Sequence, residues 1–396
     1  MRAACLLFPA IFVLVACGSS SGSASNEAPD GGAPPSDAST GADSPTTSDA
    51  ASPDASVGTP VDAGPFVPGT PITATPSEWT WVPFPEATCG DGSSTGIGVN
   101  LSATGTDVLI YLEGGGGCWN AETCYTLQSA ANFTTGYSQT TFEAESADAT
   151  YLAEPGGFFD RTASANPFKD YSYVYVPYCT GDIHGGSNVV QLGSMTAHFT
   201  GYSNFAAYLR RVVPTFAAAS RVILSGSSAG GFGALLNWGQ TQSAFGAVRV
   251  DLLDDSGTFM PLDVVAEGNG DGPTQSTAWN LPAAMPAGCA ACATDPSALY
   301  AYYAKLYPTH REALLSYTAD SVLPSYAGIS TAEFTTGLDE ILTDDFAPNA
   351  NMQSFIYTGA GHVLFFDPQL TTGGVTLQTF VTEMVTDSTS WSSPSP

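Results

Sequence analysis

Six short apolar runs, rich in β-branched and aromatic residues, are spaced along the chain beyond its first hundred residues. Nearly continuous apolar strands are typical of a parallel sheet that helices cover on both faces. Segments of helix length separate several of the runs. The pattern therefore predicts an α/β fold with a mostly parallel sheet and long loop insertions, its strands lying at 107–114, 171–179, 221–226, 248–257, 312–320 and 353–362.

A helix is expected directly before the third of these runs. The stretch "NFAAYLRRVVPTFAAAS" has apolar residues at helical spacing, with Asn204 as a possible N-cap and Pro214 as a break or kink. In sheets of this type, ligands and catalytic groups collect at the carboxyl ends of the strands. We therefore expect the catalytic residues at these carboxyl ends.

A Gly-x-Ser-x-Gly pattern follows the strand predicted at 221–226, with Ser228 at its centre. The pattern also occurs at 18–22 and 92–96. A nucleophilic serine in this pattern occupies a tight turn between a buried strand and a helix, and small neighbours let the turn close. The first additional match lies in a stretch without apolar runs, and the second lacks the flanking strand and helix. Ser228 has both, and we predict it to be a nucleophile.

A run of four glycines follows the strand at 107–114, in "LEGGGGC". Glycine lets backbone N–H groups approach a substrate oxygen closely, as an oxyanion hole requires. A plain glycine-rich turn is the alternative. The position after a strand and before the nucleophile favours the oxyanion hole.

The base and the acid are sought after the nucleophile, in the chain order of such hydrolases. Among the four histidines, His362 follows the last predicted strand on small residues, whereas His184 and His198 precede Ser228, and His310 lies before a strand. We predict His362 as the base. Two aspartates end intervening strands: Asp320 is favoured as the acid, and Asp255 is the alternative, or a carboxylate that binds loop amides beside the pocket.

The N-terminal residues are typical of a bacterial lipoprotein. Residues 1–16 read as a signal peptide, and "LVAC" resembles a lipobox whose Cys17 would carry the lipid; ordinary secretory cleavage is the alternative. Residues 17–75 are rich in Ser, Ala, Pro, Gly and Asp, which predicts a disordered tether. The expected catalytic domain is 76–396. We expect a protein exported and lipid-anchored in the outer membrane or at the cell surface.

Charge and cysteine content narrow the function further. The formal net charge of −28 argues against nucleic acid as a partner and against binding to anionic surfaces. The membrane contact is expected through the lipid alone, and the protein is expected to be a monomer. Six cysteines remain beyond Cys17, and an even number in an exported chain suggests three disulfides. The cysteines that lie close in sequence suggest disulfides within one loop. The candidate pairs are Cys89 with Cys179, Cys118 with Cys124, and Cys289 with Cys292. A zinc site at "CAAC" is the less favoured alternative.

Five blocks together resemble the pectin acetylesterase and Notum family of α/β-hydrolase-like enzymes: "LIYLEGGGGCW", "YCTGD", "GSSAGGFG", "DSG" and "GAGH". The resemblance runs from about Cys89 to Phe366. It implies a secreted serine carboxylesterase without metal or organic cofactor. Matched residue by residue, it implies the nucleophile Ser228, the acid Asp320, the base His362, and oxyanion donors at Gly115, Gly116 and Ala229.

Four further residues lie in or beside these blocks and are possible pocket residues: Trp119, Asp182, His184 and Asp255. The family often carries an aromatic residue in the glycine loop where this chain has Gly116 and Gly117, so we expect a more open pocket wall there. The expected substrate is an acylated glycan, and the favoured candidates are O-acetyl esters of extracellular polysaccharide. The alternatives are a lipase or polyester hydrolase that prefers longer acyl chains, and a catalytically inert glycan-binding lipoprotein.

Overall fold

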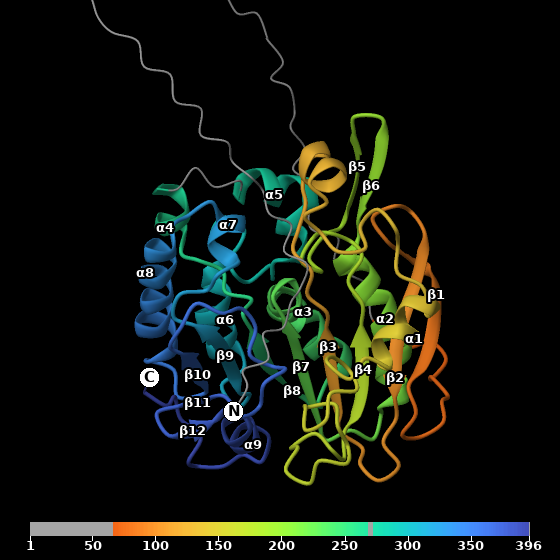
Figure 1. The fold of residues 1–396 in the computed structure, drawn as a ribbon, viewed down its shortest axis with the longest axis vertical. Helices are drawn as coiled ribbons and strands as arrows, with labels where there is room; N and C mark the ends of the chain where they lie inside the picture. The colour runs from red at the N-terminus through yellow and green to blue at the C-terminus, as the bar shows by residue number, and fades with distance from the viewer. Residues whose placement is uncertain (1–65, 268–271, 396) are drawn as a thin grey trace, which may run out of the picture. The chain divides into compact units, whose positions relative to one another are not determined.

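One eight-stranded sheet forms the centre of the protein. The structure is a computed structural model that describes residues 66–267 and 272–395. The strand order is β1-β2-β4-β3-β7-β8-β9-β10, and the pairing is parallel from β4 to β10 and antiparallel at β1–β2 and β2–β4. This confirms the predicted α/β fold with a mostly parallel sheet (Figure 1).

All six predicted strands are present, although several are a few residues shorter than expected. The register pairs Leu112 with Gly226 and Ser227 with Asp255, so the carboxyl ends of three adjacent strands lie level. The strands of this sheet are β1 (Thr80–Thr88), β2 (Ser94–Asn100), β3 (Val108–Leu112), β4 (Ser172–Val176), β7 (Arg221–Ser227), β8 (Arg249–Asp255), β9 (Glu312–Tyr317) and β10 (Met352–Tyr357).

Helices cover both faces of the sheet because its central strands alternate apolar side chains to either side. Leu112 and Leu224 pack into one core with residues of α2, α3, α6 and α8. Leu109 and Ile223 pack into the other with residues of α1 and α9. The helices are α1 (Gln139–Ser146), α2 (Gly201–Thr215), α3 (Ala229–Phe245), α4 (Leu262–Glu267), α5 (Gly272–Trp279), α6 (Leu299–Leu306), α7 (Leu323–Ala327), α8 (Thr331–Ile341) and α9 (Leu377–Val385).

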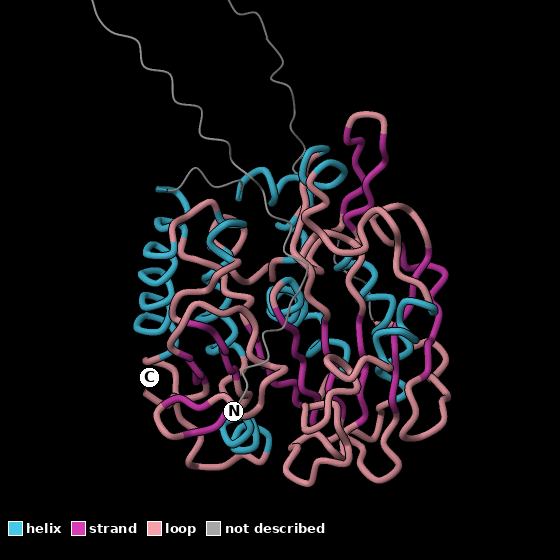
Figure 2. The backbone as a smooth tube through the Cα atoms, viewed as in Figure 1, coloured by secondary structure: helices cyan, strands magenta, loops and turns pink. Residues whose placement is uncertain are grey.

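The connections are long, as Figure 2 shows by the extent of loop at both ends of the sheet. An antiparallel hairpin, β5 (Asn188–Leu192) with β6 (Met195–Phe199), projects at the top of the view in Figure 1, where α4, α5 and α7 also lie. A second small hairpin joins β11 (Thr371–Thr372) to β12 (Val375–Thr376). Short π or 3₁₀ turns occupy Glu122–Thr126, Leu281–Ala284, Pro296–Ala298 and Leu342–Phe346. Within the described ranges, no helix has the length and apolar character needed to cross a membrane.

Two boundaries differ from the sequence-based expectations. The side chain of Ile72 is buried and its N–H donates to Thr215 Oγ1 at 2.7 Å, so the packed chain begins before residue 76. Helix α2 begins at Gly201, and Asn204 lies inside it. The Asn204 side chain instead bonds both backbone groups of Thr88 on β1, so it serves a tertiary contact and not a cap.

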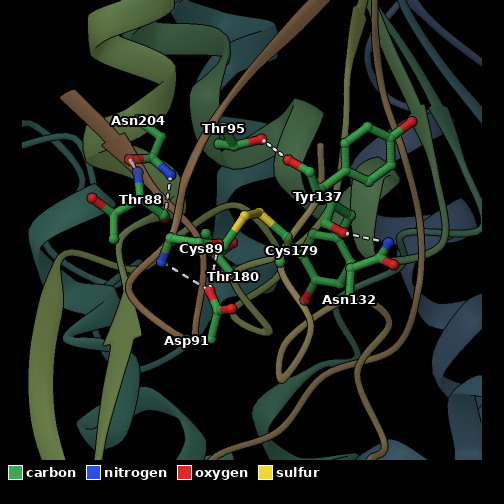
Figure 3. The surroundings of a disulfide bond; sticks show 12 residues. Thr88, Cys89, Asp91, Thr95, Asn132, Tyr137, Cys179, Thr180 and Asn204 are labelled. Carbon is green, nitrogen blue, oxygen red and sulfur yellow. Dashed lines mark hydrogen bonds between the residues drawn. A yellow bond between two sulfur atoms is a disulfide. The ribbon is translucent and has the colours of Figure 1, made fainter. Parts of the chain in front are cut away.

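Three disulfides lie in the described part of the chain and pair the cysteines as their spacing suggested. Cys118 joins Cys124 and Cys289 joins Cys292, each within one loop. Cys89 and Cys179 join segments 90 residues apart, tying the turn after β1 to the chain that leaves β4 (Figure 3). Asn132 in the same region donates to the Tyr178 carbonyl at 3.1 Å. This disulfide therefore holds the end of β4, which lies beside the glycine loop.

Candidate active site

Ser228 occupies a sharp turn between β7 and α3. Its φ of 57° and ψ of −123° lie outside the regions that L residues ordinarily adopt, as in the strained strand-to-helix turn of hydrolases. The turn can close because its neighbours are glycines: a Cβ at Gly226 would lie 2.2 Å from the Gly230 carbonyl oxygen, and one at Gly230 would lie 2.0 Å from that of Leu112. The two glycines are therefore required by close backbone approach.

The neighbouring Ser227 is held inside the protein. Its hydroxyl donates to Asp255 Oδ2 at 2.6 Å and accepts from the Tyr111 hydroxyl at 2.9 Å. Ser228, in contrast, lines a cavity. Of the two adjacent serines, Ser228 is thus the one placed to meet a ligand.

Asp320 and His362 form a hydrogen-bonded pair beyond the ends of β9 and β10. His362 Nδ1 lies 2.7 Å from Asp320 Oδ2, and Asp320 is fully buried. The other oxygen, Oδ1, accepts the N–H groups of Val322 and Leu323, each at 2.8 Å. Both carboxylate oxygens are therefore engaged, which fixes the orientation of the imidazole.

The chain after His362 packs onto the end of β8, next to the serine turn. Asp255 accepts the N–H groups of Leu364 at 2.9 Å and Phe365 at 3.1 Å, and its carbonyl accepts the Ser228 N–H at 2.8 Å. His362 Nε2 is buried and has no hydrogen-bond partner among the described residues. No hydrogen bond joins it to Ser228 in this structure; such bonds in ligand-free sites are often long and tighten with substrate.

Asp255 holds the loop that carries His362 but does not bond its imidazole. Its carboxylate contacts Ser227, Leu364 and Phe365, and burial raises its pKa. These contacts match the second role expected for Asp255 from the sequence, that of a strand-end carboxylate that binds neighbouring loop amides.

The glycine loop brings backbone donors to the same edge of the sheet. Gly115 and Gly116 have φ of 150° and 76°, which favour glycine. Among the described residues, the N–H groups of Gly115, Gly116 and Ala229 have no hydrogen-bond acceptor. A Cβ at Gly114 would lie 3.0 Å from Ser228 Cβ, so the loop passes directly beside the serine.

A cavity of about 520 Å³ opens between the serine turn and the segments above it. Its wall includes Gly116, Ser228 and Ala229, so the predicted nucleophile and two predicted donors meet there. The rest of the wall is mainly apolar and includes Ile183, Phe232, Phe259, Met260, Leu262, Val265, Trp279, Leu281, Leu323 and Ala327.

The four possible pocket residues are not among those that line the cavity. Trp119 is buried and packs edge-on against Trp279. Asp182 is fully buried and binds the Thr180 hydroxyl and the Gly201 N–H, and burial raises its pKa to about 6. His184 is also buried, and its Nε2 lies 2.8 Å from the Glu113 carbonyl.

The wall beside the glycine loop is closed, not open as the missing aromatic residue suggested. A Cβ at Gly116 would lie 2.4 Å from the Tyr326 hydroxyl, and one at Gly117 would lie 3.5 Å from the Trp279 ring. Tyr326 and Trp279 both line the cavity. Sequence reasoning missed them because they come from α7 and α5, far along the chain, and no motif marks them.

Comparisons with known proteins find relatives of this chain. The family model described as pectinacetylesterase matches residues 76–280. The palmitoleoyl-protein carboxylesterase NOTUM of Schmidtea mediterranea is 32% identical over 160 residues, which cover 39% of this chain and 29% of the relative. NOTUM of Homo sapiens is 28% identical over 180 residues, covering 44% and 34%. The chain thus spans about a third of the length of these relatives.

A solved structure shares the fold. The Wnt deacylase Notum from Drosophila superposes with a TM-score of 0.56 at 19% sequence identity, over 79% of this chain and 94% of that one. The family model covers more than half of the present chain, including the glycine loop and the serine turn. The chain therefore belongs to the pectinacetylesterase family of carboxylic ester hydrolases.

Proposed function

We propose that the protein is a serine carboxylesterase in which Ser228, His362 and Asp320 form the catalytic triad. The observation that carries the proposal is the placement of Ser228 in a strained turn that lines a mainly apolar cavity. His362 is paired with Asp320, and the chain that follows His362 is anchored on the end of the adjacent strand β8. A surface protein that only binds glycans would need neither the strained serine nor a buried carboxylate aligned with a histidine.

The proposed chemistry is acyl transfer to Ser228 followed by hydrolysis. His362 Nε2 takes the serine proton and delivers it to the leaving alcohol, while Asp320 fixes the tautomer and stabilises the imidazolium. The N–H groups of Gly115, Gly116 and Ala229 receive the oxyanion. These donors have no other acceptor among the described residues, so no hydrogen bond has to break before they bind charge.

The cavity favours an acyl chain longer than acetyl. Its volume of about 520 Å³ and its apolar wall offer far more room than one methyl group fills. Each buried methylene contributes about 0.8 kcal/mol, close to fourfold in binding, until the cavity is full. The relatives named as palmitoleoyl-protein carboxylesterases act on a long acyl group, which agrees with this preference.

A series of p-nitrophenyl esters from acetate to palmitate tests both the activity and the acyl preference. We expect kcat/KM to rise from acetate to a medium chain length before it falls. No turnover of any ester would refute the esterase. A maximum at acetate, declining at once with butyrate, would refute the acyl preference while leaving the esterase intact.

Deacetylation of an extracellular polysaccharide is the second candidate, and the family model favours it. The cavity wall also carries Gln275, Ser276 and Asp295, whose polar side chains could contact a sugar. Two measurements decide between the candidates. One is acetate release from acetylated xylan, acetylated mannan and acetylated pectin, and the other is release of longer acyl groups from lipids.

We further propose that the protein is exported and anchored by a lipid on Cys17, which lies outside the described residues. Disulfides form in oxidising compartments, and the described part holds three of them. Growth of the host with a labelled fatty acid should label the protein, and Cys17→Ser should remove the label. A freely secreted, unlabelled protein would refute the anchor.

A further inference from the structure

Two side chains hold opposite ends of the glycine loop. His184 Nε2 lies 2.8 Å from the carbonyl oxygen of Glu113, directly before the loop. The Tyr178 hydroxyl donates to the carbonyl oxygen of Gly116 at 2.8 Å. Since a carbonyl only accepts, the His184 imidazole must carry its proton on Nε2.

These contacts fix the two peptides that flank those carrying the Gly115 and Gly116 N–H groups. In a trans peptide the carbonyl and the following N–H point in opposite directions. Binding the Glu113 carbonyl therefore directs the Gly114 N–H away from His184. The Gly115 carbonyl accepts from Ala131 at 2.8 Å, which directs the Gly116 N–H to the opposite side, where it stays free. A run of four glycines has no conformational preference of its own to fix these directions.

His184 and Tyr178 also support one another. Their rings pack with centroids 4.8 Å apart, and the Tyr178 hydroxyl accepts the N–H of Ile183 at 2.8 Å. The Tyr178 N–H donates to Glu113 Oε2 at 2.8 Å. The two rings thus form one buried unit, here called the His184–Tyr178 clamp, whose backbone is fixed by the disulfide at Cys179.

We propose that the His184–Tyr178 clamp is a positioning device that holds the oxyanion loop in its donor geometry. The proposal rests on the proposed function. His184 acts as a neutral hydrogen-bond donor and does not exchange protons with the substrate. Two observations agree: the ring is 3% exposed, and burial lowers its pKa to about 4, so it stays uncharged at neutral pH.

The test compares His184→Ala, His184→Gln and Tyr178→Phe by kcat, KM and the inhibition constant of a trifluoromethyl ketone. That ketone adds the serine oxygen to its carbonyl, and the resulting oxyanion reports on the hole. Removing one oxyanion donor typically lowers kcat by about 10²–10³, and a displaced loop should cost His184→Ala about 10–10². KM should change little, and ketone affinity should fall in proportion to kcat/KM. The glutamine amide can donate the hydrogen bond that Nε2–H donates. His184→Gln should therefore restore most of kcat and most of the ketone affinity.

His198→Ala is the matched control, since His198 lies on β6 and does not line the cavity. The extent of fluorophosphonate labelling gives the fraction of folded sites, and rates are expressed per labelled site. Wild-type kcat and ketone affinity in His184→Ala would overturn the clamp. If that variant fails to fold, Tyr178→Phe decides: it keeps the ring, and an unchanged kcat and ketone affinity there overturn the proposal. A wild type without Ser228-dependent turnover would refute the proposed function instead.

Discussion

Asp320 and Asp255 are both buried carboxylates at strand ends, but their partners differ. Asp320 binds the His362 imidazole at 2.7 Å, whereas Asp255 binds the Ser227 hydroxyl and two backbone N–H groups of the following loop. We therefore predict that Asp320→Asn lowers kcat by about 10⁴ with little change in KM, because the imidazole loses its correct tautomer.

Asp255→Asn should instead lower the stability of the protein. The amide cannot accept at both atoms, and each carboxylate oxygen accepts one loop N–H, so either Leu364 or Phe365 loses its partner, at a cost of about 1–3 kcal/mol. Nitrophenyl ester kinetics and urea unfolding, measured on both variants, separate the two roles. A large loss of kcat in Asp255→Asn with an active Asp320→Asn would transfer the acid role to Asp255.

The sequence alone could indicate these residues as candidates because each follows an apolar run and stands in the required order. Order does not tell which of two aspartates reaches the imidazole, since that depends on the geometry of two loops. The contact of His184 with Glu113 could not be predicted from the sequence either, because 71 residues separate the two and only the fold brings them together.

At the scale of elements, the end of β8 holds a second buried carboxyl that bears on stability. Asp254 Oδ1 accepts the Gly257 N–H at 2.9 Å, and Oδ2 is buried without a partner among the described residues. Burial, followed by the neighbouring Asp255, raises its pKa to about 8. Glu312 at the start of β9 and Tyr300 on α6 also interact with it electrostatically.

A raised carboxyl pKa makes the protein less stable as pH rises. An unfolded aspartate loses its proton near pH 4, whereas folded Asp254 keeps its proton to about pH 8. Between these values the unfolding free energy should fall by up to about 1.4 kcal/mol per pH unit, and it should level off above pH 8. Asp254→Asn should flatten this slope, because the amide keeps the bond to Gly257 without ionising. Urea unfolding from pH 5 to 8.5 measures the slope of the unfolding free energy against pH. Substitution of the exposed Asp339, Asp339→Asn, is the control. An unaltered slope in Asp254→Asn would contradict the assignment to Asp254.

The central strands were predictable because burial on both faces leaves an apolar run. The two antiparallel strands β1 and β2 were not, since β1 contains two prolines and several exposed positions, and β2 carries glycines. The β5–β6 hairpin was missed for a similar reason: its exposed Val189 and Met195 give no alternation of apolar and polar residues. Most of the cavity wall comes from loops and short helices between β8 and β9 and from α7 after β9, and these segments give no long periodic pattern.

At the scale of the whole molecule, negative charge dominates, with a formal net charge of −28. Three of the nine Lys and Arg residues are engaged elsewhere: Arg221, Arg249 and Arg311 form ion pairs with Asp251 and Asp387. The residues that line the cavity include Asp295 but no lysine or arginine. The electrostatic field therefore disfavours polyanionic substrates.

We predict that neutral acetylated glycans, such as acetylxylan or acetylated mannan, lose acetate faster than acetylated pectin at low ionic strength. Salt should narrow the gap, since the Debye length falls from about 30 Å at 0.01 M to about 8 Å at 0.15 M. Acetate release from each polymer at low and high salt measures the effect. Faster release from pectin at low salt would show that a local basic site overrides the field.

The central claim is that Ser228 is the nucleophile, and mapping a fluorophosphonate adduct by mass spectrometry tests it most directly. The reagent phosphonylates an activated serine, and Ser227 beside it serves as an internal control. The account predicts one adduct per chain, on Ser228, formed as esterase activity is lost, and neither adduct nor turnover in Ser228→Ala. An adduct on another serine, or a Ser228→Ala protein that keeps more than about a tenth of wild-type kcat, would contradict it.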